Sequence, residues 1–139
     1  MGLRQDGGTV SRFLANLTDH RGEIGAYANE WQGWVNPRER SVPIAGRVNT
    51  AEIDETDRVD DRVGCYAFLY LPGSGTRYTA YIGFSTSLRT EIEQQLGLKR
   101  VDQAHFSFTA VYISNSDIAE AYEEDLIRFY APPWNKQFY

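Results

Sequence analysis

The sequence predicts an α+β fold in which a small three-stranded antiparallel sheet is flanked by helices. Segments 64–71 and 78–84 both have strand patterns, and the glycine-rich turn at 72–75 between them predicts an antiparallel hairpin. A third segment, His105–Ile113, is rich in aromatic and β-branched residues, which is typical of a strand. Apolar residues recur at helical spacing on either side of this third strand, and these stretches supply the flanking helices.

Alternation along the hairpin predicts which side chains share a face. Tyr66 lies on one face of the first strand together with Phe68 and Tyr70. In the second strand Tyr81 shares a face with Thr79 and Gly83, and the opposite face carries Tyr78, Ala80, Ile82 and Phe84. Pairing across the hairpin can therefore bring Tyr66 and Tyr81 onto one surface.

Two helices are expected in the second half of the chain. The first runs from Ser85 to Leu96, and Gly97 ends it. The second has a broad apolar face over residues 118–130 and stops at the prolines that follow. Glu123 lies on the same side of this helix as its apolar residues. Its carboxylate is either partly buried there and in need of a partner, or simply solvated, as helical spacing alone favours for a glutamate in so acidic a helix.

Residues 1–61 are predicted to form a helical and loop extension that packs on or next to a core formed by residues 62–139. Helical spacing begins at Thr9 and is weaker over Glu23–Trp31, and residues 31–50 look like a loop that mixes tryptophans with arginines. This loop either contacts a nucleic acid or covers the sheet with its tryptophans while the arginines stay solvated. The arginines in question are Arg38, Arg40 and Arg47. We expect the extension to supply target recognition or a homodimer contact.

Composition favours an intracellular protein, cytoplasmic or nucleoid-associated, that does not enter a membrane. The chain of 139 residues suits one domain and contains a single cysteine, so no internal disulfide can form. No apolar run approaches the roughly 20 residues that span a bilayer. The net charge of −5 counts against a nucleic-acid partner, but six acids are concentrated between residues 52 and 61, which leaves room for a basic surface elsewhere.

Six residues in the second half of the chain occur in the order and spacing of a known motif. Gly64-Cys65-Tyr66 and Tyr81-Ile82-Gly83 occupy the two hairpin strands, and Glu123 on the last helix is followed by a proline and then by Asn135, twelve positions on. In these features the chain resembles the GIY-YIG nuclease family over about residues 62–136. The resemblance implies a metal-dependent endonuclease that hydrolyses a phosphodiester bond, with DNA as its partner.

The same resemblance implies roles for individual residues. Glu123 would hold one divalent cation, Mg²⁺ or Mn²⁺, which prefers oxygen ligands. Tyr66 would act as general base or orient the attacking water, and Tyr81 would position the water or the phosphate. Asn135 would order the site from the loop after the last helix. The motif glycines, Gly64 and Gly83, would let the backbone approach the substrate closely.

The chain departs from the family at one position. The family places an arginine on the first helix, where it stabilises negative charge on the phosphate, and that position holds Glu91 here. Arg89 is two residues away and about 200° round the helix, so it is a candidate for this catalytic role only if the helix starts differently or the chain slips. Lys99 and Arg100, beyond Gly97, are the other candidates for this cation, and both could contact nucleic acid. Two alternatives to the nuclease stay open: a catalytically impaired domain that binds nucleic acid or a protein, and an interaction module whose motif match is accidental.

Overall fold

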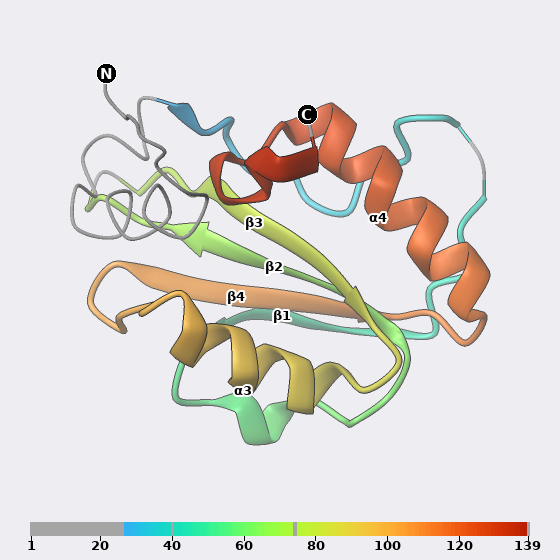
Figure 1. The fold of residues 1–139 in the computed structure, drawn as a ribbon, viewed down its shortest axis with the longest axis horizontal. Coiled ribbons are helices and arrows are strands. Elements are labelled where there is room, and N and C mark those ends of the chain that lie inside the picture. Colours follow the sequence, from blue (N-terminus) through green and yellow to red (C-terminus); the bar gives the residue numbers. More distant parts are fainter. Residues whose placement is uncertain (1–26, 40, 74, 139) are drawn as a thin grey trace.

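The computed structural model describes residues 27–39, 41–73 and 75–138 and has an α+β architecture (Figure 1). One antiparallel sheet has the strand order β1-β4-β2-β3. Its strands are β1 (Gly46–Glu52), β2 (Gly64–Tyr70), β3 (Tyr78–Ser85) and β4 (Phe106–Tyr112). The prediction of three strands was wrong by one, because β1 lies in the stretch interpreted as a loop. Its register against β4 shifts between Val48 and Ala51, and this bulge breaks the alternation that marks a strand.

The predicted hairpin is confirmed as β2 and β3, with Tyr66 opposite Gly83 and Phe68 opposite Tyr81. Tyr66 and Tyr81 therefore share one face, as expected. A second register shift follows Phe68, where Leu69 pairs with Thr79 and so leaves one extra residue in β3. This bulge moves Tyr78 and Ala80 onto the Tyr66 face, so their predicted place beside Ile82 and Phe84 was wrong.

The two helices cover opposite faces of the sheet (Figure 1). On the first face, Leu88 and Ile92 of α3 (Leu88–Leu98) pack into a core that includes Tyr66 and Phe68. The second face carries α4 (Ser116–Tyr130), whose apolar side packs on Cys65, Ala67, Leu69 and Ile82. Each large side chain that is fully buried in these cores contributes about 1.5–3 kcal/mol to folding. With both faces covered, every residue of β2 is buried.

The helix ends follow local chemistry. The side chain of Asn115 accepts a hydrogen bond from the Ile118 N–H at 3.0 Å and so caps α4, and Ala131 adopts φ of 48° where this helix ends before the prolines. The expectation that Gly97 ends α3 was wrong, since the helix continues to Leu98. A glycine is tolerated inside a helix at a cost of about 0.8–1 kcal/mol relative to alanine.

Residues 29–38 form a covering segment over α4. The Trp31 ring stacks on Tyr130 with centroids 4.9 Å apart, and the Tyr130 hydroxyl donates to the Gly33 carbonyl at 2.7 Å. The Tyr122 hydroxyl donates to the carbonyl of Val35 at 2.8 Å. Trp31 and Trp34 thus cover the sheet and α4. Of the two interpretations of this loop, this is the one in which its tryptophans cover the sheet.

The helical pattern over Glu23–Trp31 falls partly outside the described residues. Its end is not helical, because Glu30 bridges to Tyr78 and the Trp31 N–H donates to the carbonyl of Arg77 at 2.8 Å. The beginning of β3 is therefore paired on its outer edge. The helix predicted from Thr9 lies outside the described residues.

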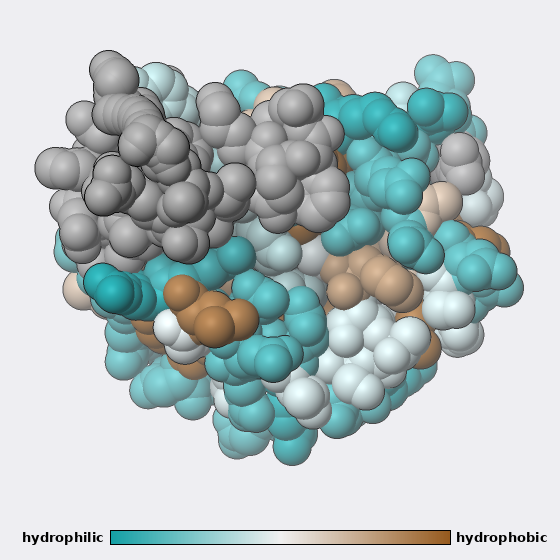
Figure 2. Space-filling model, in the orientation of Figure 1, coloured by the Kyte–Doolittle hydropathy of each residue, from teal (hydrophilic) through white to brown (hydrophobic). Residues whose placement is uncertain are grey.

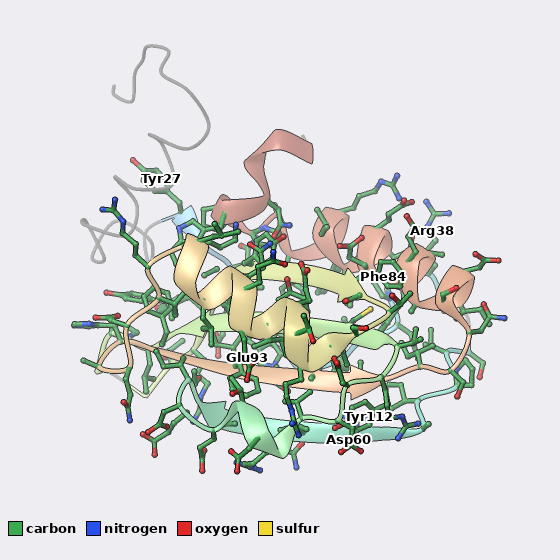
Figure 3. All side chains as sticks on the ribbon, turned by 60° about the horizontal axis from the view of Figure 1, so that its bottom comes forward. Tyr27, Arg38, Asp60, Phe84, Glu93 and Tyr112 are labelled. Carbon is green, nitrogen blue, oxygen red and sulfur yellow. The ribbon has the colours of Figure 1, made fainter. Side chains whose placement is uncertain are left out.

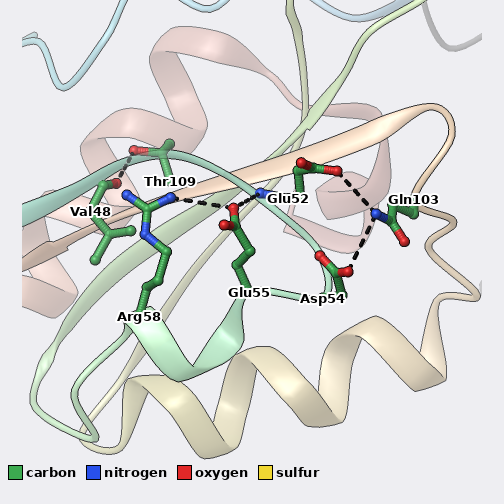
Figure 4. A network of polar contacts seen from close by, with 7 residues as sticks. All are labelled: Val48, Glu52, Asp54, Glu55, Arg58, Gln103 and Thr109. Carbon is green, nitrogen blue, oxygen red and sulfur yellow. Dashed lines mark hydrogen bonds and ion pairs between the residues drawn. The ribbon is translucent and has the colours of Figure 1, made fainter.

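The acidic stretch after β1 is held together by its own contacts (Figure 4). Glu55 accepts from the Glu52 N–H at 2.9 Å and from the Arg58 guanidinium at 3.3 Å. The Gln103 amide donates to Glu52 at 3.0 Å and to Asp54 at 3.4 Å. This stretch contains the short 3₁₀ helix η1 (Thr56–Arg58), which lies beside α3.

Hydrophobic residues on the face shown in Figure 2 form separate patches between hydrophilic ones. Among the described residues, the large apolar side chains most exposed to solvent are Tyr27, Leu98 and Phe129. No helix in the described ranges has both the length and the apolar character needed to cross a membrane.

Candidate active site

The two motif tyrosines meet at the β2–β3 pair, on the sheet face that α3 covers. Tyr66 is fully buried and its ring centroid is 6.0 Å from that of Tyr81, which is half-buried. Glu91 comes to this place from α3, where it bonds Tyr66. Burial raises the pKa of Tyr81 to about 12, and the charges of Glu123 on α4 and of Glu91 add to this effect. The structure therefore brings Tyr66 and Tyr81 into contact, and Glu123 acts on Tyr81 through its charge.

Gly83 is required because the Tyr66 phenol lies over it. A Cβ atom at Gly83 would stand 2.4 Å from Cζ and 2.5 Å from the hydroxyl oxygen of Tyr66. A Cβ atom at Gly64 would stand 2.0 Å from the Val111 carbonyl oxygen and 2.7 Å from Leu88 Cδ1. The space beside both glycines is thus occupied by the protein itself, whereas the sequence interpretation reserved it for the substrate.

The Tyr66 hydroxyl donates a hydrogen bond to Glu91 Oε2 at 3.0 Å. Burial raises the pKa of Tyr66 far above its usual range, and the negative charges of Tyr81 (when ionised) and of Glu91 raise it further. Tyr66 therefore stays protonated at neutral pH and acts as a hydrogen-bond donor. Of the two roles suggested from the sequence, acting as general base does not fit this environment, and orienting the attacking water stays a prediction.

Glu123 is half-buried beside β3, where the Phe84 N–H donates to it. Burial is the main cause that raises the pKa of Glu123 to about 7, and the nearby charges of Glu124, Glu120 and Glu91 add to it. The hydrogen bond from Phe84 acts in the opposite sense. A carboxylate that is buried among other acids is stabilised in its charged form by a cation, so the environment suits the predicted ligand of a divalent metal ion.

Replacing Glu123 by glutamine is expected to stabilise the protein at high pH and to leave its stability unchanged at pH 4. The pKa of Glu123 lies near 7 in the folded chain, above its ordinary value of 4.5, so its neutral form favours folding and this contribution is lost as the pH rises through about 7. Allowing for screening by solvent, Glu123→Gln should raise the free energy of unfolding at pH 8.5 by about 1–2 kcal/mol.

Urea unfolding at pH 4 and pH 8.5 measures this difference. Glu124→Gln, which removes only a neighbouring charge, should show a smaller gain of the same sign. A gain that is equal at both pH values would contradict the buried, neutral carboxyl.

Lys99 is half-buried at the end of α3, and its ammonium lies 4.3 Å from the centroid of the Tyr81 ring. Burial lowers the pKa of Lys99, and the nearby carboxylate of Glu91 opposes this effect. Lys99 thus places a positive charge beside Tyr81. The sequence named Lys99, with Arg100, as a candidate for the missing cation and as a residue that could contact nucleic acid.

Asn135 is fully buried and is bonded to the strand that carries Tyr81. Its side-chain oxygen accepts from the Ile82 N–H at 2.8 Å, and its amide nitrogen donates to the Ile82 carbonyl at 2.9 Å. The amide thus replaces a neighbouring strand along this part of β3. Asn135 therefore fixes the backbone next to Tyr81, and its role in ordering a catalytic site stays a prediction.

Two of the cations named from the sequence, Arg89 and Arg100, do not contact Tyr66 or Tyr81 in the described residues. The Arg89 guanidinium donates to the carbonyls of Val59 at 2.7 Å and Asp57 at 3.0 Å, so it is used in holding η1 against α3. Arg89 points to this side because it lies about 200° round the helix from Glu91. It is therefore unsuited to replace the arginine that the family has at the position of Glu91. Arg100 is exposed just beyond the end of α3, where it adopts φ of 52°.

Arg38 and Arg47 belong to the α4 side of the molecule. Arg38 pairs with Asp125 of α4 at 3.0 Å and lies beside that helix in Figure 3, while Arg47 is exposed on β1 and its charge acts on Tyr122. Arg40 lies outside the described residues. Neither described arginine contacts the tyrosines, so the expected basic surface is separate from the site.

The donors present fit a weakly held divalent ion. In the part of the chain that the structure describes, no group of three or more histidine, cysteine, aspartate or glutamate side chains is arranged to hold a metal. Glu123 supplies carboxylate oxygen, and Mg²⁺ commonly binds one or two carboxylates with waters and substrate phosphate completing its shell. Glu123 therefore suits an ion whose other ligands come from water and substrate.

Neither the protein-family models, nor the curated proteins, nor the solved structures compared with this chain match it.

Proposed function

We propose that the chain is a metal-dependent DNA endonuclease of the GIY-YIG type, which hydrolyses a phosphodiester bond. The observation that carries the proposal is the contact between Tyr66 of β2 and Tyr81 of β3, with the charge of Glu123 on α4 acting on Tyr81. All three are residues to which the resemblance assigns roles in catalysis.

Glu123 would hold the divalent cation, Mg²⁺ or Mn²⁺, and its raised pKa near 7 means that loading should improve as the pH rises. A bound ion would polarise the scissile phosphate and stabilise the leaving oxygen. Tyr81, at the open side of the pair, donates a hydrogen bond to the phosphate or to the attacking water. Burial, followed by the charges of Glu123 and Glu91, raises the pKa of Tyr81 to about 12, so it acts as a donor at neutral pH.

Tyr66 and Asn135 fix the position of Tyr81. Tyr66 fills the space over Gly83 and packs against the Tyr81 ring, while Asn135 holds the backbone of Ile82. The side chains of Tyr66 and Asn135 are both fully buried, so packing holds them in place, which is what a preorganised site needs.

The test is nicking of supercoiled plasmid in Mg²⁺ or Mn²⁺. Wild-type protein should cleave, EDTA should stop it, and Glu123→Ala should reduce the rate on the order of 100-fold or more, since the ion stabilises charge in the transition state. The matched control is Glu124→Ala, which removes an exposed acid from the adjacent position and should retain activity within about threefold. Equal loss in both variants would argue against Glu123 as the ligand.

A second candidate is a catalytically impaired GIY-YIG-like domain that binds nucleic acid or a protein partner. The hydrogen bond from Tyr66 to Glu91 favours it, because a carboxylate stands where the family has a guanidinium. If folded wild-type protein cleaves none of plasmid, single-stranded and branched DNA, the same assay is repeated with Glu91→Arg. Cleavage gained by that variant would identify a decayed nuclease.

A further inference from the structure

Three cations lie on or just after α3, and only one of them faces the site. Arg89 is used by the carbonyls of Val59 and Asp57, and Arg100 is exposed beyond the helix end. The ammonium of Lys99 lies beside the site, 4.3 Å from the centroid of the Tyr81 ring. The choice among the three is therefore made by their positions on the helix.

Helical spacing explains why Lys99 reaches this place. Glu91, Gln95 and Lys99 follow one another at intervals of four and so form one row along α3. Within this row the side-chain amide of Gln95 donates to Glu91 Oε2 at 3.4 Å. The backbone N–H of Lys99 donates to the backbone carbonyl of Gln95 at 2.9 Å, so the helical turn extends to Lys99. Glu91 at one end bonds Tyr66, and Lys99 at the other end covers Tyr81.

A nuclease site with this composition needs a positive charge. Glu91 and Glu123 are both negative when ionised, and each opposes the approach of a phosphate whose charge grows in the transition state. Loss of one well-placed electrostatic contact commonly costs on the order of 100-fold in rate. A partly desolvated ammonium is a strong source of such a contact, because water screens it less.

We propose that Lys99 supplies the positive charge that contacts the scissile phosphate, in place of the arginine that Glu91 excludes. The aromatic face of Tyr81 holds the ammonium next to the tyrosine that positions the same phosphate. A lysine on a flexible stem can follow the phosphate during reaction, as a point charge with three donors. This inference rests on the proposed nuclease function and names the residue that completes that site.

The test compares Lys99→Met, Lys99→Arg and the matched control Arg100→Met. Each methionine variant removes one positive charge from the same end of α3, so long-range attraction of DNA falls equally in both. In the plasmid assay, kcat should fall on the order of 100-fold for Lys99→Met and stay within about threefold for Arg100→Met. Lys99→Arg keeps the charge and should recover part of the lost rate.

A second readout does not need cleavage. The ¹⁵N resonance of the Lys99 side chain is followed by NMR while a short DNA duplex is added in EDTA, and it should shift as phosphate approaches the ammonium. If wild-type protein cleaves but Lys99→Met behaves as Arg100→Met does, the role of Lys99 is overturned and the nuclease stands. If wild-type protein cleaves nothing, the proposed nuclease fails, and an unmoved Lys99 resonance then overturns the phosphate contact as well.

Discussion

Gly83→Ala is expected to destabilise the protein by about 3 kcal/mol and to abolish cleavage, because the added methyl group overpacks a filled site. The new Cβ atom would lie 2.4 Å from Tyr66 Cζ, and Tyr66 has no exposed side through which to retreat. Moving the phenol aside would also break its hydrogen bond to Glu91 and its contact with Tyr81. Urea unfolding measures the stability, and the plasmid assay measures the activity.

A double-mutant cycle isolates the cause. Leucine at position 66 lacks the ring atoms that the new methyl group would strike, so Gly83→Ala in a Tyr66→Leu background should cost less than about 1 kcal/mol. The interaction energy should therefore reach about 2 kcal/mol. If Gly83→Ala costs the same in both backgrounds, the phenol is not what requires the glycine.

Gly64→Ala is expected to have the largest effect on stability, a loss of about 4 kcal/mol or failure to fold. Its Cβ atom would stand 2.0 Å from the carbonyl oxygen of Val111 and 2.7 Å from Leu88 Cδ1. The carbonyl belongs to β4, which is fixed by its pairing with β2, so a side-chain rotation cannot relieve the contact. The strands would have to separate where α3 begins.

Gly97→Ala is the matched control for Gly64→Ala. Nothing lies within 4 Å of a Cβ atom at Gly97, which sits inside α3. Alanine there should raise the free energy of unfolding by about 0.5–1 kcal/mol, since glycine weakens helix interiors. Urea midpoints of the two variants should thus move in opposite directions, and a stable Gly64→Ala would contradict the close approach of β4.

Local patterns predicted the hairpin, both helices and the third strand, because each of these elements has regular spacing. They did not reveal β1, where the shift between Val48 and Ala51 interrupts the alternation, nor the changed face of Tyr78, which depends on a bulge in β3. Bulges are set by pairing with a neighbouring strand, and one strand read alone does not show them. The end of α3 was predicted too early because glycine was taken as a stop signal, whereas it is only a weak helix former that a helix tolerates in its interior.

Spacing also predicted that Tyr66 and Tyr81 would share a surface, and that Arg89 would point away from the position of Glu91. The hydrogen bond from Tyr66 to Glu91 and the placement of Lys99 on Tyr81 could not be predicted in the same way. Both contacts depend on how far α3 lies from the hairpin. The periodicity of a sequence predicts which face of a helix is buried but not its distance from a sheet. The i, i+4 row from Glu91 to Lys99 was the available signal.

The bonds between Asn135 and Ile82 also affect whether a further strand can pair with this edge of the sheet. An edge strand with unpaired N–H and carbonyl groups is a template on which a second chain can add a strand. Along β3 those groups are taken within the chain, by Asn135 at Ile82, by the Asn29 carbonyl at the Thr79 N–H and by the Trp31 N–H at the Arg77 carbonyl. The same amide that orders the candidate site therefore closes this sheet edge to strand addition, so loss of Asn135 should also favour aggregation.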